Sequence, residues 1–294
     1  MKILVAGGTG LLGTPLVKEL ERRGHDVLVL SRSANQENQI KWNPSDNFLE
    51  DDARLQEVEV IVNLCGEGIN DRRWTDRRKK ELEDSRIGTN TFLFSQVHRF
   101  LSLTHFVSAS GITAYPFDDG VHLWQEKEQY GDSYIAQLVR KWEESADLFS
   151  AVVPVCKIRI AVVLAEGGGA LPQLASLSKK FLGSALGDGQ QQMPWVAIDD
   201  LVGIFAHAIE KQLKGVYNSN AGNISNENLM KAVKNEVEVN FSLPKVPATV
   251  IELVFGERGE LLLKGNRASN LKIIGTGFQF QYDTIDKALA KYIK

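Results

Sequence analysis

The sequence predicts an α/β fold, in which a Rossmann-type doubly wound parallel sheet carries a smaller C-terminal α/β lobe. Short runs of apolar and β-branched residues recur at the spacing of βαβ units, at residues 2–6, 26–30, 58–64, 104–108 and 155–160. Helical patterns separate these runs, most clearly at residues 79–100 and 133–149. This alternation is typical of a parallel sheet with helices on both faces.

The first expected strand runs directly into a turn that contains Gly7, Gly10 and Gly13. Glycines here let the chain turn sharply, and they bring backbone N–H groups close to a diphosphate at the N-terminus of the next helix. The turn therefore predicts a nucleotide site, although a tight turn without a ligand has the same composition. The expected phosphate-binding residues are Gly7, Thr9, Gly10, Leu11, Leu12 and Gly13.

The residues that follow the second expected strand bear on the choice of cofactor. Enzymes that prefer NAD usually place Asp or Glu there, where it binds the ribose 2′-hydroxyl. This chain has Ser31 and Arg32 instead. A guanidinium can pair with the 2′-phosphate of NADP, which a carboxylate would repel. The pair favours NADP(H) as cofactor, and the alternative is that Arg32 is a solvated surface charge.

The carboxyl ends of parallel strands meet at one edge of a sheet, and ligands bind beyond that edge. The ends of the third, fourth and fifth expected strands should therefore join the glycine turn around the cofactor. The residues expected there are Leu64, Cys65, Gly66, Ser108, Ala109 and Arg159.

Composition narrows the possible partners. The 294 residues are 43% hydrophobic and carry a net charge of −3, which argues against nucleic acid as a main partner. Residues 72–80 form one basic cluster, and acidic residues follow it at once, as on a solvated helix face. Two cysteines are too few for a disulfide framework. With no long apolar run and a strand at residue 2, we expect a cytoplasmic protein that acts on a small molecule as a monomer or homodimer.

The local composition of the sequence suggests two structural units. We expect an NAD(P)-binding Rossmann domain at residues 1–164, joined by residues 196–221, and a C-terminal substrate lobe made of residues 165–195 and 222–294. Residues 165–172 have the composition of a loop, residues 215–220 that of a returning strand, and residues 264–267 that of an exposed connector.

Several motifs resemble one known group. The chain resembles the extended short-chain dehydrogenase/reductase superfamily, and within it a family of nucleoside-diphosphate-sugar epimerases. The resemblance implies a Rossmann domain, NADP and a substrate cleft roofed by the C-terminal lobe. Beyond the glycine turn, the motifs that carry it are residues 63–67, 73–75, 84–86, 107–110, 187–190, 195–201 and 261–265.

One departure from the superfamily concerns catalysis. Its catalytic members carry Tyr-x-x-x-Lys in the helix after the serine-bearing strand, where the lysine ammonium lowers the phenol's pKa. Here Ile135 and Val139 align with that pair. The expected substitutes are Ser110, Tyr115 and Tyr134, and the alternative for either tyrosine is a partly buried ring with its hydroxyl at the rim.

Other polar and aromatic residues give weaker signals. Trp74 and Trp195 could wall a substrate pocket, but tryptophans more often fill cores. Asp199 and Asp200 are more simply an N-cap than a catalytic pair, and the histidines show no metal-ligand spacing, so we expect no metal. The sequence thus predicts an NADP-dependent oxidoreductase or epimerase that acts on a small polar substrate such as a nucleotide sugar. The alternative is a non-catalytic NADP-binding sensor or scaffold.

Overall fold

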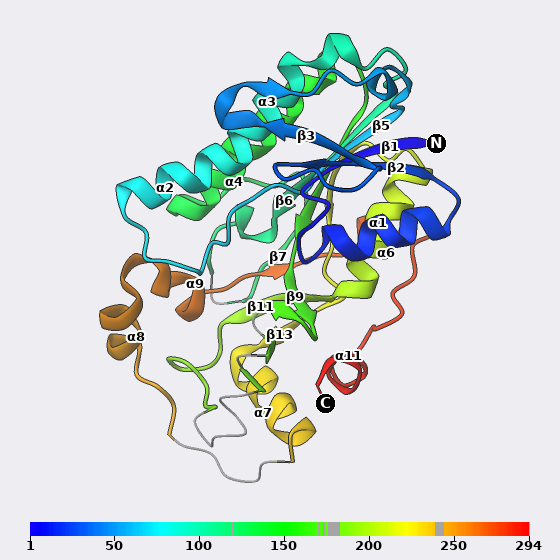
Figure 1. Ribbon diagram of the computed structural model, residues 1–294. Coiled ribbons are helices and arrows are strands. Elements are labelled where there is room, and N and C mark those ends of the chain that lie inside the picture. Colours follow the sequence, from blue (N-terminus) through cyan, green and yellow to red (C-terminus); the bar gives the residue numbers. More distant parts are fainter. Residues whose placement is uncertain (119, 170, 173, 176–182, 239–243, 294) are drawn as a thin grey trace.

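A computed structural model describes residues 1–118, 120–169, 171–172, 174–175, 183–238 and 244–293. A large sheet with helices on both faces dominates the fold (Figure 1). Its strands, in spatial order, are β12 (Gly215–Asn218), β8 (Val155–Ile160), β6 (His105–Gly111), β5 (Val60–Asn63), β1 (Lys2–Ala6), β2 (Asp26–Ser31), β3 (Gln39–Asn43) and β4 (Phe48–Leu49). All neighbouring pairs are parallel except β3 with β4. The order reverses direction at β1, which confirms the predicted doubly wound sheet.

Helices cover both faces of this sheet. They are α1 (Gly13–Arg22) and α6 (Ile198–Glu210) on one face, and α2 (Asp76–Glu83), α3 (Thr89–Ser95) and α4 (Tyr134–Ala146) on the other. A π-helical turn at Asp84–Gly88 joins α2 to α3 without a break, so the helix expected at residues 79–100 is present as one helical segment over residues 76–95.

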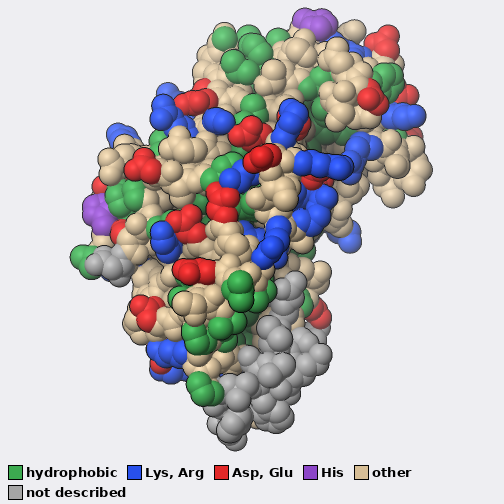
Figure 2. Space-filling view, turned by 90° about the vertical axis from the view of Figure 1, so that its left-hand side faces the viewer, with side chains coloured by type: hydrophobic (Ala, Val, Ile, Leu, Met, Phe, Trp, Pro, Cys, Tyr) green, Lys and Arg blue, Asp and Glu red, His purple; other side chains and the backbone are tan. Residues whose placement is uncertain are grey.

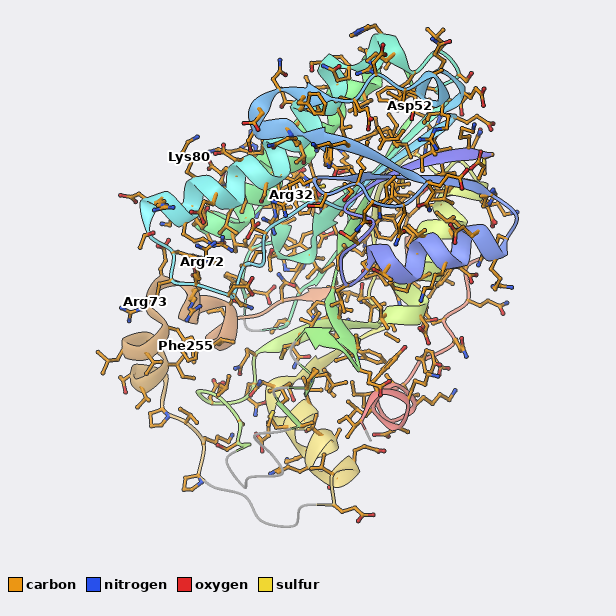
Figure 3. All side chains as sticks on the ribbon, viewed as in Figure 1. Arg32, Asp52, Arg72, Arg73, Lys80 and Phe255 are labelled. Atoms are coloured by element: carbon orange, nitrogen blue, oxygen red, sulfur yellow. The ribbon has the colours of Figure 1, made fainter. Side chains whose placement is uncertain are left out.

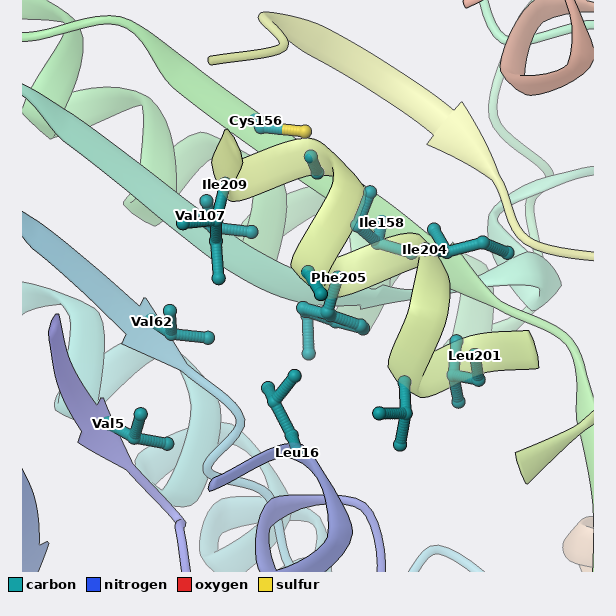
Figure 4. Close-up of a cluster of buried hydrophobic side chains, with 14 of the residues drawn as sticks. Val5, Leu16, Val62, Val107, Cys156, Ile158, Leu201, Ile204, Phe205 and Ile209 are labelled. Carbon is teal, nitrogen blue, oxygen red and sulfur yellow. The ribbon is translucent and has the colours of Figure 1, made fainter. Parts of the chain in front are cut away.

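The packing of β1 shows why its sequence is apolar throughout. Ile3 and Val5 belong to the core beneath α1 and α6, which Figure 4 shows in close-up, whereas Leu4 and Ala6 belong to the core beneath α3 and α4. Side chains alternate between the two faces of a strand, and here both faces are covered. The strand therefore holds the following glycine turn at a fixed place on the sheet edge.

A second sheet lies beside the first. Its strands are β10 (Gly168–Gly169), β9 (Val162–Ala165), β11 (Gln192–Ala197) and β13 (Gly222–Ser225), in spatial order. Helices α7 (Asn226–Glu236) and α11 (Ile285–Tyr292) pack on this sheet through one apolar cluster. The remaining elements are β7 (Leu123–Trp124), which pairs with β14 (Arg267–Ala268), and the helices α8 (Ala248–Phe255), α9 (Glu260–Leu263) and α10 (Leu271–Ile274).

Two local expectations are wrong. The connector at residues 264–267 is not exposed as a whole, because the Gly265 carbonyl and the Asn266 N–H form backbone hydrogen bonds and both residues are buried. Asp199 and Asp200 are not an N-cap either, since Ala197 holds that position in α6. The buried carboxylate of Asp200 instead accepts hydrogen bonds from the backbone N–H groups of residues 281 and 282.

Among the helices of the described residues, none combines the length and the apolar character needed to cross a membrane.

Candidate functional site

The glycine turn lies between β1 and α1 and is built around close backbone contacts. Gly7 has a φ of 80°, and its carbonyl accepts a hydrogen bond of 3.1 Å from Gly10. A Cβ at Gly13 would lie 2.1 Å from the Gly7 oxygen, so this position accepts no side chain. A Cβ at Gly10 would meet only that oxygen, at 3.3 Å. The turn is therefore tight on its inner side and open at Gly10.

The N-terminus of α1 has no side-chain cap. Leu12 holds the N-cap position without a side-chain hydrogen bond, and the first turn carries no acidic residue. The Thr14 N–H donates to the Gly10 carbonyl at 3.0 Å and Pro15 has no N–H, so the Leu12 and Gly13 N–H groups are the ones left for water or an anion, and the helix dipole favours an anion. Thr9, Gly10 and Leu11 are exposed beside this end. These features fit a diphosphate.

The turn lies directly against the residues that follow β5. A Cβ on Gly7 would come within 3.0 Å of the Leu64 carbonyl carbon and 3.2 Å of the Cys65 nitrogen. Leu64 and Cys65 are half-buried and Gly66 is exposed. The predicted gathering of these residues at one sheet edge is therefore observed.

Arg32 is exposed and follows β2 at the same edge (Figure 3). Burial raises the pKa of the Cys65 thiol to about 12, and the charge of Arg32 is the effect that opposes this shift. Within the described ranges, no acidic side chain forms an ion pair with Arg32. Ser31, one residue earlier, accepts a hydrogen bond from the Ser33 N–H through its hydroxyl. A guanidinium without an acidic partner is free to bind an added anion.

The other expected cofactor residues are less accessible. Ser108 is fully buried, Ala109 is 3% exposed and Arg159 is 1% exposed. The Arg159 guanidinium forms an ion pair with Glu143, with Nε 2.8 Å from Oε1. None of these three side chains is open to solvent.

Ser110 is buried at the carboxyl end of β6. Its hydroxyl donates a hydrogen bond of 2.6 Å to Glu143 of α4, and the same carboxylate accepts one of 2.7 Å from Tyr130. Ser110 lies opposite Arg159 in the register of β6 and β8, so all of these groups converge on one side of the sheet. Sequence reasoning missed Glu143 and Tyr130, because only the folded chain brings residues 110, 130, 143 and 159 together.

Tyr115 is fully buried, which matches neither a hydroxyl open to a substrate nor the partly buried ring of the alternative. Its hydroxyl donates to Asn218 at 2.8 Å, and its ring stacks on Trp124. Burial raises its pKa to about 12. Nothing here resembles a hydroxyl at the rim of a pocket.

Tyr134 is half-buried at the start of α4. Its ring meets Trp74 edge-on, and the Lys79 ammonium lies 4.6 Å from the ring centroid. Burial raises the pKa of its hydroxyl to about 12, so this phenol is protonated at neutral pH. Ile135 and Val139, which align with the missing Tyr and Lys, are 1% and 2% exposed and pack in apolar surroundings.

The basic cluster at residues 72–80 is not wholly a solvated face. Arg78 is 3% exposed and donates to the Gly68 carbonyl at 2.7 Å, and Arg86 is 5% exposed and donates to the Glu67 carbonyl at 2.8 Å. The two arginines thus hold the loop that follows Gly66. Elsewhere on the face that carries α2 and α8, acidic side chains lie among the basic ones (Figure 2).

The remaining candidates are structural. Trp74 is 9% and Trp195 3% exposed, as core residues are. The Trp74 indole donates to the Ile69 carbonyl at 2.9 Å. In the part of the chain that the structure describes, no three His, Cys, Asp or Glu side chains gather as metal ligands would.

Comparison with known proteins agrees with this geometry. Residues 3–220 match the NAD dependent epimerase/dehydratase family, and residues 246–292 match a domain of unknown function, DUF1731. The mouse (Mus musculus) epimerase family protein SDR39U1 is 32% identical, over 98% of each chain.

Two solved structures extend the comparison. Human epimerase family protein SDR39U1 (isoform 2), crystallised with NADPH, superposes with a TM-score of 0.89 at 30% identity over 99% of each chain. A nucleoside-diphosphate sugar epimerase from Corynebacterium glutamicum gives a TM-score of 0.80 at 28% identity, over 100% of this chain and 58% of its own. With the doubly wound sheet and the uncapped glycine turn, these matches show that the chain belongs to the NAD dependent epimerase/dehydratase family.

Proposed function

We propose that the protein is an NADP(H)-dependent oxidoreductase or epimerase that acts on a nucleotide sugar. The observation that carries this proposal is the placement of polar groups at one sheet edge. The open glycine turn and the exposed Arg32 lie at the carboxyl ends of β1 and β2, and the Ser110 cluster lies at the carboxyl ends of β6 and β8 of the same sheet. This is where doubly wound sheets bind a dinucleotide and its substrate.

The cofactor half of the proposal rests on residues 7–13, 31–32 and 64–66. The N–H groups at the start of α1 would hold the diphosphate, and Arg32 would hold the 2′-phosphate. The similar human protein is crystallised with NADPH, which supports NADP(H) for this chain. When bound, the nicotinamide supplies the hydride acceptor and donor of the reaction.

The substrate half rests on Ser110. We place this hydroxyl nearest the reacting oxygen, because it ends the strand that follows β5 in the sheet order. The similar Corynebacterium glutamicum protein is named a nucleoside-diphosphate sugar epimerase, which supports a nucleotide sugar as substrate. For Tyr115, full burial and the hydrogen bond to Asn218 support a structural role, and the hydroxyl of the half-buried Tyr134 donates to the Lys79 carbonyl at 3.3 Å.

A second candidate function is a non-catalytic NADP(H) sensor. The observation that favours it is the replacement of the usual pair by Ile135 and Val139, both buried in apolar surroundings. Neither side chain can carry a proton or lower the pKa of a phenol.

One experiment separates the two functions. The protein is loaded with NADP⁺ and mixed with a panel of nucleotide sugars, and the absorbance of the reduced nicotinamide is followed through a single turnover. The enzyme proposal expects at least one sugar to reduce the bound cofactor, and Ser110→Ala should slow that step by roughly 10- to 1,000-fold. If no member of the panel reduces it while NADPH still binds, the sensor replaces the enzyme.

We further propose that the protein works in the cytosol, as a monomer or homodimer. Cys65 and Cys156 are both free thiols, as a reducing compartment would keep them. Cell fractionation and light scattering test these two statements.

A further inference from the structure

The Glu143 carboxylate receives four hydrogen bonds from three side chains. Oε1 accepts from Ser110 at 2.6 Å and from Arg159 Nε at 2.8 Å. Oε2 accepts from Tyr130 at 2.7 Å and from Arg159 Nη2 at 3.1 Å. A carboxylate offers about four lone-pair positions. Its accepting capacity is therefore fully used within the protein.

Glu143 is ionised in this setting. Burial alone would raise its pKa, but the hydrogen bonds and the charge of Arg159, with the hydrogen bonds from Ser110 and Tyr130, hold the pKa below its ordinary value. An ionised carboxylate only accepts hydrogen bonds. Ser110 and Tyr130 must therefore be the donors in their contacts with Glu143.

Each of these hydroxyls has one proton, and that proton is committed to Glu143. What remains on the Ser110 and Tyr130 oxygens are lone pairs. To donate to a ligand, either hydroxyl would have to leave a charged, buried acceptor unsatisfied, which is costly. Toward a ligand, both oxygens can accept but not readily donate.

We propose that Glu143 is a positioning residue, which turns the hydroxyl protons of Ser110 and Tyr130 inward so that the site offers its ligand two hydrogen-bond acceptors and binds an alcohol in preference to a ketone. The proposal rests on the proposed function in placing the ligand at Ser110. It adds Tyr130 and Glu143 to that site. It also names the form of the substrate that the resting site selects, which is the hydroxyl form.

The first test detects the Tyr130 contact without any ligand. The protein is labelled with tyrosine that carries carbon-13 next to the hydroxyl, and its six tyrosines are observed by NMR. Tyr130→Phe assigns the Tyr130 resonance by its loss. Glu143→Gln should shift that resonance while the signals of tyrosines away from Arg159, such as Tyr282 and Tyr292, stay in place; Tyr115 is not used as a reference because the Arg159 guanidinium lies 4.7 Å from its ring centroid. The control is Glu144→Gln, because this neighbouring side chain is 58% exposed and pairs with Arg140 instead.

The second test measures the preference itself. Cyclohexanol and cyclohexanone, which differ only in their oxygen function, are titrated into the NADP⁺ complex, and binding is read from the Ser110-dependent shift of the Tyr130 resonance. We expect the alcohol to bind about fivefold more tightly, the effect of one net hydrogen bond. In Glu143→Gln the new amide can donate to one hydroxyl oxygen and free its proton, so the ratio should fall to about one.

Three results would overturn the proposal. In the first, the Tyr130 resonance does not move in folded Glu143→Gln. In the second, the unaltered protein binds the ketone as tightly as the alcohol or more tightly, and in the third it binds neither compound. If Glu143→Gln does not fold, Tyr130→Phe replaces it, with binding measured by isothermal calorimetry because the Tyr130 resonance is then absent. This variant should reduce the preference for the alcohol by removing one acceptor. Neither test requires turnover, so a failure of the proposed function in the nucleotide-sugar panel leaves these outcomes readable.

Discussion

The two ends of the candidate site differ in what their side chains are free to do. Around the glycine turn, the backbone makes the shape, Gly10 and Leu11 are exposed, and Arg32 has no acidic partner among the described residues. Around Ser110, the hydroxyls and the Glu143 carboxylate are already hydrogen-bonded to one another and to Arg159, whose Nη1 is the one buried atom of this group without a partner, and Ser110, Glu143 and Arg159 are each at most 2% exposed. The first region is built to receive an anion. The second is built to hold its own side chains in one arrangement.

The difference is also one of energy. Removing a partner from a buried ion pair leaves an uncompensated charge in the core, whereas removing an exposed, unpaired arginine leaves the fold unaffected. Substitutions at the two ends should therefore separate stability from cofactor binding.

The largest effect is expected from Glu143→Ala. It strands the Arg159 guanidinium and frees two hydroxyls, so we expect the free energy of unfolding to fall by about 3–5 kcal/mol. Urea denaturation at neutral pH measures this change. The control is Glu144→Ala, which loses only an exposed pair and should change stability by less than about 0.5 kcal/mol. Similar losses of stability in Glu143→Ala and Glu144→Ala would contradict the proposed difference between the buried and the exposed ion pair.

The next effect is expected from Gly10→Val. A side chain here meets only the Gly7 oxygen, so the fold should persist, but it occupies the space that the diphosphate needs. At a concentration of NADPH about 100 times the Kd, the unaltered protein should gain about 2.7 kcal/mol of stability and the variant none. Thermal melting with and without NADPH tests this. Full stabilisation of the variant would place the diphosphate elsewhere.

Arg32→Ala should sharpen the contrast by changing affinity alone. A charge-assisted contact is worth about 1.5–3 kcal/mol, so NADPH should bind roughly 10- to 100-fold more weakly while NADH is unchanged. Isothermal calorimetry with both cofactors measures this. Arg77→Ala, at a side chain that is 90% exposed, is the matched control and should leave both affinities unaltered. Equal affinity of the unaltered protein for NADPH and NADH would contradict the assignment of Arg32 to the 2′-phosphate.

The smallest effect is expected in alkaline solution. Burial raises the pKa of Tyr115 and of Tyr134 to about 12 each, above the ordinary value of 10. A group whose folded pKa is raised contributes stability that is present below its unfolded pKa and is lost as pH rises through the folded value. Stability should therefore decline between about pH 10 and 12. Tyr115→Phe should decline less, and an identical profile would show that Tyr115 ionises freely in the folded chain.

The fold could be predicted because its signals are local. The apolar run at residues 2–6 and the glycines that follow it determine their own conformation, and β1 and its turn lie where expected. Strand β3 was missed although Ile40 and Trp42 alternate with Gln39 and Lys41 as in a strand with one buried face, because an alternation of only five residues is a weak signal before its pairing with β2 is known.

The Ser110 end could not be predicted in the same way. Glu143 reads in the sequence as one of several charged residues on a helix, and its role depends on Tyr130, Ser110 and Arg159 arriving from three other segments. The burial of Arg78 was not predicted for the same reason. This residue lies in a charged run that is otherwise solvated, yet its side chain is buried against the Gly68 carbonyl. Such contacts are properties of the tertiary structure and leave no periodic signal.

The central claim is that the cofactor lies along the glycine turn and over the residues after β5. Cys65 tests it most directly, because it is the partly exposed cysteine of the chain, whereas Cys156 is buried in the core. The measurement is the rate of Cys65 alkylation by iodoacetamide at pH 9, since the raised pKa of this thiol leaves very little reactive thiolate at neutral pH. The reaction is followed by mass spectrometry with and without saturating NADPH. The account predicts that NADPH slows this alkylation by roughly tenfold or more, and that Gly10→Val abolishes the protection. An unchanged rate in the presence of bound NADPH would contradict it.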